Sequence, residues 1–107
     1  LLLLGMTFKK DIGDVRNSPS VRVAELLIQR GVELSYHDNY AAEIMLNGET
    51  YSNVNLDDAM LKQYDAVILL VGHSYYDLQG IIKNSSLIVD TRNVAGILGP
   101  HPNVVKI

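Results

Sequence analysis

The chain has 107 residues, of which 48% are hydrophobic and 20% charged, so it is long enough for one globular domain with a buried core. Its net charge of −3 argues against a general binder of nucleic acids or membrane surfaces, which would carry a basic surface. The sequence contains no cysteine, which excludes disulfides, a thiol nucleophile and a Cys-ligated metal within this chain.

The first third of the chain predicts a strand, a polar loop, a helix and a second strand. Residues 1–6 form an unbroken apolar run, typical of a strand that is covered on both faces. After the polar loop, Ser18 before Pro19 predicts a helix over residues 19–30, with Ser18 as the N-cap. Alternating apolar and polar side chains predict the second strand at residues 32–37.

The middle of the chain has weaker signals. Residues 41–46 predict a helical turn, Asn47-Gly48 predicts a turn, and residues 50–53 predict a short edge strand. Asn55 is the predicted N-cap of a helix over residues 56–63.

The last third returns to strong patterns. Residues 66–71 are fully apolar and predict a buried strand, and residues 76–82 predict a short helix. Residues 87–89 and 104–107 predict the last two strands, and the glycines and prolines between them indicate a loop.

The order of these elements predicts an α/β fold: a Rossmann-like three-layer sandwich with a mostly parallel, doubly wound sheet. We expect the strand at residues 66–71 beside the first strand, with the strand at residues 32–37 on its other side. Ligands of such sheets bind at the carboxyl ends of the strands, where the winding direction switches. His73 leaves one of the two central strands, and Arg92 leaves the next strand out, about 10 Å from the first.

The polar loop at residues 5–19 is denser in charge than any other stretch of the chain, and we expect it to contact an anionic ligand. Gly5 stands alone, without the G-x-G-x-x-G pattern, so side-chain charge would have to hold a phosphate. Lys9 is the best candidate, as a point charge with three donors, although a solvated loop lysine is an open alternative. Ion pairs of Arg16 with Asp11 and Asp14 that stiffen the loop are an alternative to ligand contact.

Arg92 is the second candidate, because an arginine directly after a buried strand presents a rigid fork of donors at the ligand edge. The alternative is a surface pair with Asp90, to which we assign a role in shaping the loop. The three histidines, His37, His73 and His101, have no partner at metal-ligand spacing, and each is interpreted as structural. The sequence predicts neither a complete catalytic site nor a metal site.

Four strings of this sequence resemble the C-terminal, UDP-binding domain of the UDP-glucose/GDP-mannose dehydrogenase family. They are G-M-T-F-K-K-D-I-G-D-V-R-N-S-P, Y-H-D at the second strand, D-A-V-I-L-L-V-G-H, and V-D-T-R-N. The resemblance covers essentially the whole chain, and F-K-x-D-x-x-D-x-R-x-S-P is its most specific part. It implies an oxidoreductase that oxidises the C6 hydroxyl of a nucleotide sugar to a carboxylate, by two NAD-dependent hydride transfers through a cysteine thioester.

The resemblance also implies a role for four residues. Phe8 and Lys9 match positions that contact the nucleotide-sugar substrate, with Lys9 near the diphosphate. Arg92 matches an arginine that binds the nucleotide part, and Arg16 matches one that reaches toward NAD held mainly by an N-terminal domain. No catalytic residue is expected here, since the family's nucleophilic cysteine and assisting lysine lie in preceding domains.

We therefore expect residues 1–107 to be a single substrate-nucleotide-binding domain, a C-terminal fragment of a longer enzyme and inactive on its own. V-G-H and R-N-S-P favour the UDP-N-acetylmannosamine dehydrogenase branch. The family implies a homo-oligomer in the cytoplasm that serves polysaccharide biosynthesis, with no nucleic-acid or membrane partner. The alternative is a non-catalytic Rossmann-like module that binds a nucleotide or a partner protein for regulation.

Overall fold

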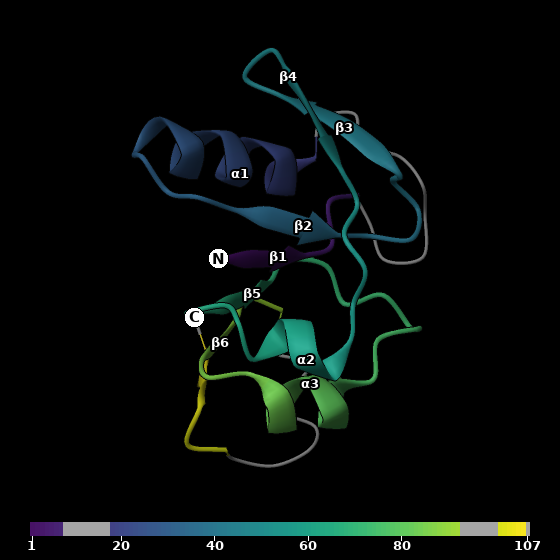
Figure 1. Ribbon diagram of the computed structural model, residues 1–107, viewed down its shortest axis with the longest axis vertical. Coiled ribbons are helices and arrows are strands. Elements are labelled where there is room, and N and C mark those ends of the chain that lie inside the picture. The colour runs from purple at the N-terminus through teal and green to yellow at the C-terminus, as the bar shows by residue number, and fades with distance from the viewer. Residues whose placement is uncertain (8–17, 93–100, 107) are drawn as a thin grey trace.

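Two sheets and three helices make up the described part of this computed structural model, which is residues 1–7, 18–92 and 101–106 (Figure 1). The main sheet consists of β1 (Leu2–Leu4), β2 (Ser35–His37), β5 (Val67–Leu69), β6 (Ile88–Asp90) and β7 (Val104–Lys106). The second sheet is a hairpin of β3 (Glu43–Leu46) and β4 (Glu49–Ser52). The helices are α1 (Pro19–Gln29), α2 (Asp58–Leu61) and α3 (Leu78–Asn84).

The strands of the main sheet lie in the order β2-β1-β5-β6-β7, and every neighbouring pair is parallel. The chain winds outward from β1 to β2 and then in the opposite direction through β5, β6 and β7. This topology confirms the predicted α/β class and the predicted neighbours of the first strand. The winding therefore switches between β1 and β5, and the carboxyl ends of these two strands are where a ligand is expected.

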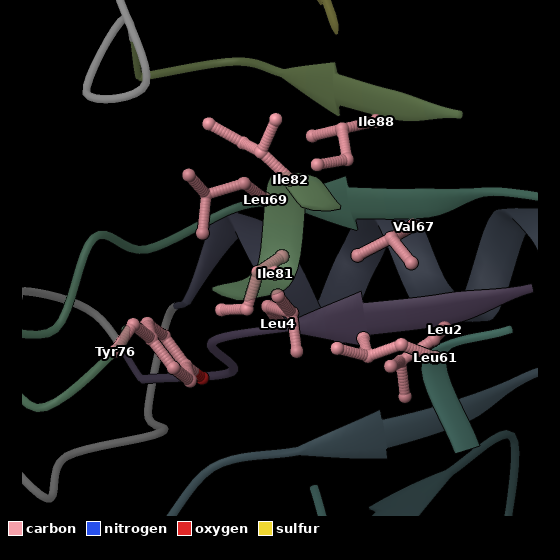
Figure 2. Close-up of a cluster of buried hydrophobic side chains, with 9 residues drawn as sticks. All are labelled: Leu2, Leu4, Leu61, Val67, Leu69, Tyr76, Ile81, Ile82 and Ile88. Atoms are coloured by element: carbon pink, nitrogen blue, oxygen red, sulfur yellow. The ribbon is translucent and has the colours of Figure 1, made fainter. Parts of the chain in front are cut away.

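β1 contributes to two separate cores. Its side chains alternate between the faces of the sheet, so Leu2 and Leu4 join one cluster and Leu3 joins the other. Figure 2 shows the first cluster, in which Leu61 of α2 and Ile81 of α3 pack with β1. All three leucines are at most 1% exposed, which corresponds to about 1.5–3 kcal/mol of stabilisation for each side chain.

The opposite face of the sheet is covered by α1 and the β3–β4 hairpin, which lie on the far side of β1 and β2 from α2 and α3 (Figure 1). Ala24 of α1 is fully buried there, and Ile44 and Leu46 of β3 pack into the same cluster. The sheet is thus a middle layer between two covering layers, as predicted.

Helix α1 begins at Pro19, as predicted. Ser18 occupies the N-cap position with an extended backbone, but its side chain makes no capping hydrogen bond. The Ser18 hydroxyl is buried and has no hydrogen-bond partner among the described residues. At the other end, Gly31 has a φ of +83°, and the amides of Gly31 and Val32 donate to the carbonyls of Ile28 and Leu27. Val32 is part of this Schellman motif, so β2 begins at Ser35 and not at residue 32 as predicted.

The prediction of a helical turn at residues 41–46 is wrong, because this segment contains β3. Asn47 and Gly48 both have positive φ, 51° and 83°, as a two-residue type I′ hairpin turn requires. The hairpin turn pairs Leu46 with Glu49, so the residues before it are drawn into a strand. The predicted edge strand at residues 50–53 corresponds to β4, which pairs with β3 rather than with the main sheet.

The predicted N-cap at Asn55 is also wrong, because α2 is capped by Asp57, whose carboxylate accepts the amide of Met60 at 2.8 Å. Helix α3 likewise starts later than predicted, since Asp77 is its N-cap and accepts the amide of Gly80. In both helices an aspartate closer to the first turn provides the cap.

Candidate functional site

The exits of β1 and β5 approach each other closely at Gly5. Its amide donates to the carbonyl of His37 at 3.0 Å, and its φ is +92°. A Cβ at this position would lie 2.5 Å from the Cβ of Val71 and 2.7 Å from the Val71 nitrogen. Only glycine can therefore pass between the two strand exits. The neighbour of Gly5 is Val71 in the exit of β5, so this glycine is not a cradle for a pyrophosphate.

A buried carboxylate lies at the end of β2. Asp38 is 0% exposed, and its Oδ2 accepts the amide of Met6 at 2.7 Å and, more weakly, that of Thr7 at 3.3 Å. The Nε2 of His73 lies 2.8 Å from the same oxygen. One carboxylate oxygen thus joins the exits of β1, β2 and β5, the three strands around the switch point.

The second oxygen of Asp38 holds the segment that follows β2. It accepts the amide of Tyr40 at 2.9 Å and lies 3.4 Å from the hydroxyl of Tyr75. The Tyr75 hydroxyl in turn accepts the amide of Asn39 at 2.7 Å. We call the set of Asp38, Met6, Thr7, Tyr40, His73 and Tyr75 the Asp38 network.

His73 is a buried member of this network, with 3% exposure. A carboxylate can only accept, so the contact with Asp38 assigns the ring proton to Nε2. The Thr7 hydroxyl lies 3.2 Å from this same nitrogen. A nucleophile relay would need the hydroxyl and the carboxylate on opposite ring nitrogens. The geometry therefore supports the interpretation of His73 as structural.

Aromatic rings hold His73 in place. The ring of Tyr75 is stacked on it, with centroids 5.2 Å apart and planes 14° apart. The ring of Tyr40 lies 4.9 Å from it in a tilted arrangement. Tyr40 and Tyr75 remain 43% and 36% exposed, so they form the outer wall of the network.

Arg92 lies at the same edge of the sheet, directly after β6. Its backbone amide donates to Oδ1 of buried Asp90 at 3.0 Å, and its Nε donates to the carbonyl of Leu70 at 2.7 Å. The hydroxyl of Thr91 donates to the carbonyl of Leu69 at 2.7 Å. The exit of β6 is thus tied to the exit of β5, and Asp90 shapes this loop as predicted.

The other predicted site residues, Phe8, Lys9 and Arg16, lie outside the described residues. The proposed ion pairs of Arg16 with Asp11 and Asp14 lie outside them as well. Their roles stay predictions, but Met6 and Thr7, which lead into Phe8, are described and are held by Asp38.

Three rings in or beside the network favour their neutral forms. Burial lowers the pKa of His37 below its usual value, and burial raises the pKa of Tyr75 and of Tyr76. The Tyr76 hydroxyl donates to the carbonyl of His37 at 2.9 Å. The Nδ1 of His37 is buried and has no hydrogen-bond partner in the described part of the chain.

A pocket of about 300 Å³ lies between the rings of His37, Tyr75 and Tyr76 and the starts of α2 and α3. Asp57, Asp58 and Asp77 line it together with His37 and Tyr75. Three carboxylates make this pocket unsuited to a phosphate, and Arg92 is not among the residues that line it.

Neither a metal site nor a membrane span is found in the described ranges. No group of three or more His, Asp or Glu side chains there could hold a metal ion. None of the helices within these ranges has the length and apolarity needed to cross a membrane.

Sequence reasoning did not single out Asp38. It follows a strand of alternating apolar and polar residues, in the string Y-H-D, and an aspartate is an ordinary residue at the end of a strand. The available signal was its position: a carboxylate directly after a strand that neighbours the switch point.

Comparisons with known proteins agree with this fold. The model of the UDP-glucose/GDP-mannose dehydrogenase family, UDP binding domain, matches residues 2–96. UDP-N-acetyl-D-mannosamine dehydrogenase of Methanocaldococcus jannaschii is 31% identical over 101 residues, which are 86% of this chain and 22% of that protein. GDP-mannose 6-dehydrogenase of Azotobacter vinelandii is 41% identical over 54 residues, which are 48% of this chain and 12% of that protein.

A solved structure agrees as well. That of NDP-N-acetyl-D-galactosaminuronic acid dehydrogenase from Methanosarcina mazei superposes with a TM-score of 0.69 at 26% identity. The match covers 99% of this chain and 23% of that one, so the chain spans about a quarter of that protein or less. With a parallel sheet that switches at β1 and β5 and a family match over most of its length, the chain belongs to the UDP-glucose/GDP-mannose dehydrogenase family and corresponds to its UDP binding domain.

Proposed function

We propose that the carboxyl ends of β1, β5 and β6 bind the UDP part of a nucleotide sugar. The observation that carries this proposal is the position of Arg92, whose Nε donates to the carbonyl of Leu70 at 2.7 Å. This bond draws the guanidinium from the end of β6 toward the end of β5, beside the switch point. The family match supports the same ligand.

The diphosphate is the part of the ligand that this edge suits best. A guanidinium offers donors in a rigid fork and always carries its charge, which fits two phosphate oxygens at once. Lys9 would add a point charge from the exit of β1, with Phe8 contacting the substrate beside it. The two cations leave strands that are two places apart in the sheet, and their side chains are long enough to reach one diphosphate.

The remaining chemistry belongs to a longer protein in this proposal. The chain is its single C-terminal substrate-nucleotide-binding domain, and the whole is an NAD-dependent nucleotide-sugar 6-dehydrogenase. The described residues do not fit NAD, because Val71 fills the space beside Gly5. The cofactor would be held mainly by another domain, with Arg16 reaching toward it, and the chain alone would be inactive.

The substrate we propose is UDP-N-acetylmannosamine, as the V-G-H and R-N-S-P strings favour. Support comes from the relative of Methanocaldococcus jannaschii, whose name specifies this sugar. The assembly we propose is a cytoplasmic homo-oligomer that makes polysaccharide precursors.

UDP titration of the 107-residue chain, followed by calorimetry and by backbone NMR shifts, tests the proposal. We expect Arg92→Gln to weaken UDP binding about 10- to 100-fold, the loss of one charge-assisted hydrogen-bonding group. Lys9→Gln should weaken it by a similar factor. Arg30→Gln after α1 and Lys62→Gln after α2 are matched controls, since each removes one exposed charge at a helix end that leads into the next parallel strand and so lies at the opposite, amino edge of the sheet.

The expected result is binding by the native chain and by both controls, with shifts that centre on the exits of β1 and β6. Absence of UDP binding by the native chain would overturn the proposal. Equal affinities of Arg92→Gln and Arg30→Gln would remove Arg92 from the site.

A further inference from the structure

We propose that Asp38 and His73 are positioning residues of the nucleotide site. Their buried pair fixes the backbone at Met6 and Thr7, and thereby sets the place from which Phe8 and Lys9 start. This inference rests on the proposed function, and it assigns a role to two residues that do not touch the ligand.

The first step is that one atom connects three strand exits. Oδ2 of Asp38, which follows β2, lies 2.7 Å from the amide of Met6 and 2.8 Å from Nε2 of His73. Met6 follows β1 and His73 follows β5. β1 lies between β2 and β5 in the sheet (Figure 1), so the pair holds the exit of β1 from both sides.

The second step is that this connection is rigid. Asp38 is 0% exposed and His73 is 3% exposed, so water does not compete for their hydrogen bonds. The stacked ring of Tyr75 holds the imidazole in its plane. A buried carboxylate that accepts from several fixed donors has a single arrangement in which all of them are satisfied.

The third step is that the position of Thr7 determines where the following residues, Phe8 and Lys9, begin. Thr7 immediately precedes Phe8 and is two residues from Lys9. Peptide units are planar and successive Cα atoms are about 3.8 Å apart, so a displaced Thr7 displaces the start of the cationic segment. Charge-assisted hydrogen bonds need about 2.7–2.9 Å, and a shift of about 1 Å breaks them.

The experiment compares two substitutions of His73 with opposite chemistry. His73→Phe keeps an aromatic ring against Tyr75 and removes the donor to Asp38. His73→Gln loses the ring and places an amide donor near the position of Nε2. The readout is the dissociation constant for uridine divided by that for UDP, so a larger ratio means a stronger preference for the diphosphate. Both constants are measured on the 107-residue chain below its melting temperature.

The ratio separates positioning from stability. Partial unfolding weakens both ligands equally and leaves the ratio unchanged, whereas a misplaced Lys9 weakens only the ligand that carries a diphosphate. We expect His73→Phe to lower the ratio about tenfold, the effect of losing roughly one good contact to the diphosphate. His73→Gln should retain most of the native ratio.

Asp38 provides a second, independent test. Asp38→Asn keeps the size of the side chain but replaces one acceptor oxygen by a donor, so it should also lower the ratio about tenfold. Asp77→Asn is the matched control, because Asp77 also accepts a backbone amide, that of Gly80, at the start of α3. Its ratio should equal the native one.

The outcomes are distinguishable. A native ratio in both His73→Phe and Asp38→Asn, with UDP still preferred over uridine, overturns the positioning role and leaves the proposed function intact. An equal loss in His73→Phe and His73→Gln refutes the hydrogen bond as the cause. A native chain that does not bind UDP overturns the proposed function, and the inference falls with it.

Discussion

Gly5→Ala is the most informative single substitution for the fold beneath the site. Gly5 has a φ of +92°, a conformation that L side chains rarely adopt. The added methyl carbon would also lie 2.5 Å from the Cβ of Val71 and 2.8 Å from the Val71 carbonyl oxygen. The backbone nitrogen of Val71 is equally close, and backbone atoms cannot rotate away as a side chain can.

The magnitude follows from these two effects. The positive φ costs about 1–2 kcal/mol for a residue with a Cβ. Overpacking against Val71 adds about 1–3 kcal/mol, because the exits of two hydrogen-bonded strands must separate. Gly31→Ala isolates the first effect, since Gly31 has a φ of +83° and a methyl carbon added there would meet no atom within 4 Å. We expect Gly5→Ala to be the more destabilising of the two by about 1–3 kcal/mol.

Urea unfolding of both variants measures this difference. At equal m-values, the m-value multiplied by the difference in midpoint gives the difference in the free energy of unfolding. The same difference should lower the melting temperature of Gly5→Ala by several degrees below that of Gly31→Ala, at about 4 °C or more for each kcal/mol. Equal stabilities of the two variants would refute the close approach of the β1 and β5 exits.

Three further predictions concern two buried rings and one turn residue. Tyr36→Phe removes the bond from the Tyr36 hydroxyl to the carbonyl of Ala41 and should cost about 1–2 kcal/mol in urea unfolding. Burial raises the Tyr36 pKa to about 12, so stability should fall as the pH rises above 10, and less steeply in this variant. Burial lowers the pKa of His37, so on acidification the imidazole is protonated in the unfolded state before it is protonated in the folded state. Stability should therefore fall as the pH drops through 6.5. Thermal melts at about pH 7.5 and 5.5 measure this fall, which His37→Phe should reduce. Asn47→Gly keeps the turn but loses the bond from the Asn47 side chain to the Glu25 carbonyl on α1, which should cost about 1 kcal/mol by the same unfolding assay.

The alternation of strands and helices was enough to predict the main sheet, because each strand is an apolar run bounded by clear breaks. Residues 1–6 show this best, since all three residues of β1 are buried and serve both faces. The hairpin was missed for a physical reason. Residues 41–46 have no helix cap, and their strand character depends on a turn in which Asn47 accepts a positive φ.

The site was predicted unevenly for a similar reason. The sequence places Arg92 directly after a buried strand, and its Nε indeed lies at the expected edge, against the Leu70 carbonyl. Its contact with a ligand stays a prediction. Asp38 was not singled out, because its position after a strand does not reveal its donors, which are 32 and 35 residues away in the sequence. A local sequence pattern can place a side chain at the ligand edge of a sheet. It does not show which distant backbone amides a side chain accepts.

The geometry at Gly5 supports the proposal that side chains, and not backbone amides, hold a phosphate. The missing G-x-G-x-x-G pattern implied that backbone amides do not cradle the phosphate. Gly5 gives the same result from geometry, because the gap between the β1 and β5 exits is filled by Val71. The proposed site therefore puts the ligand outside this contact, beside Arg92, and we expect Lys9 to contact it as well. If the positioning role that we propose for Asp38 holds, affinity depends on the place of Met6 and Thr7, whose amides Asp38 accepts.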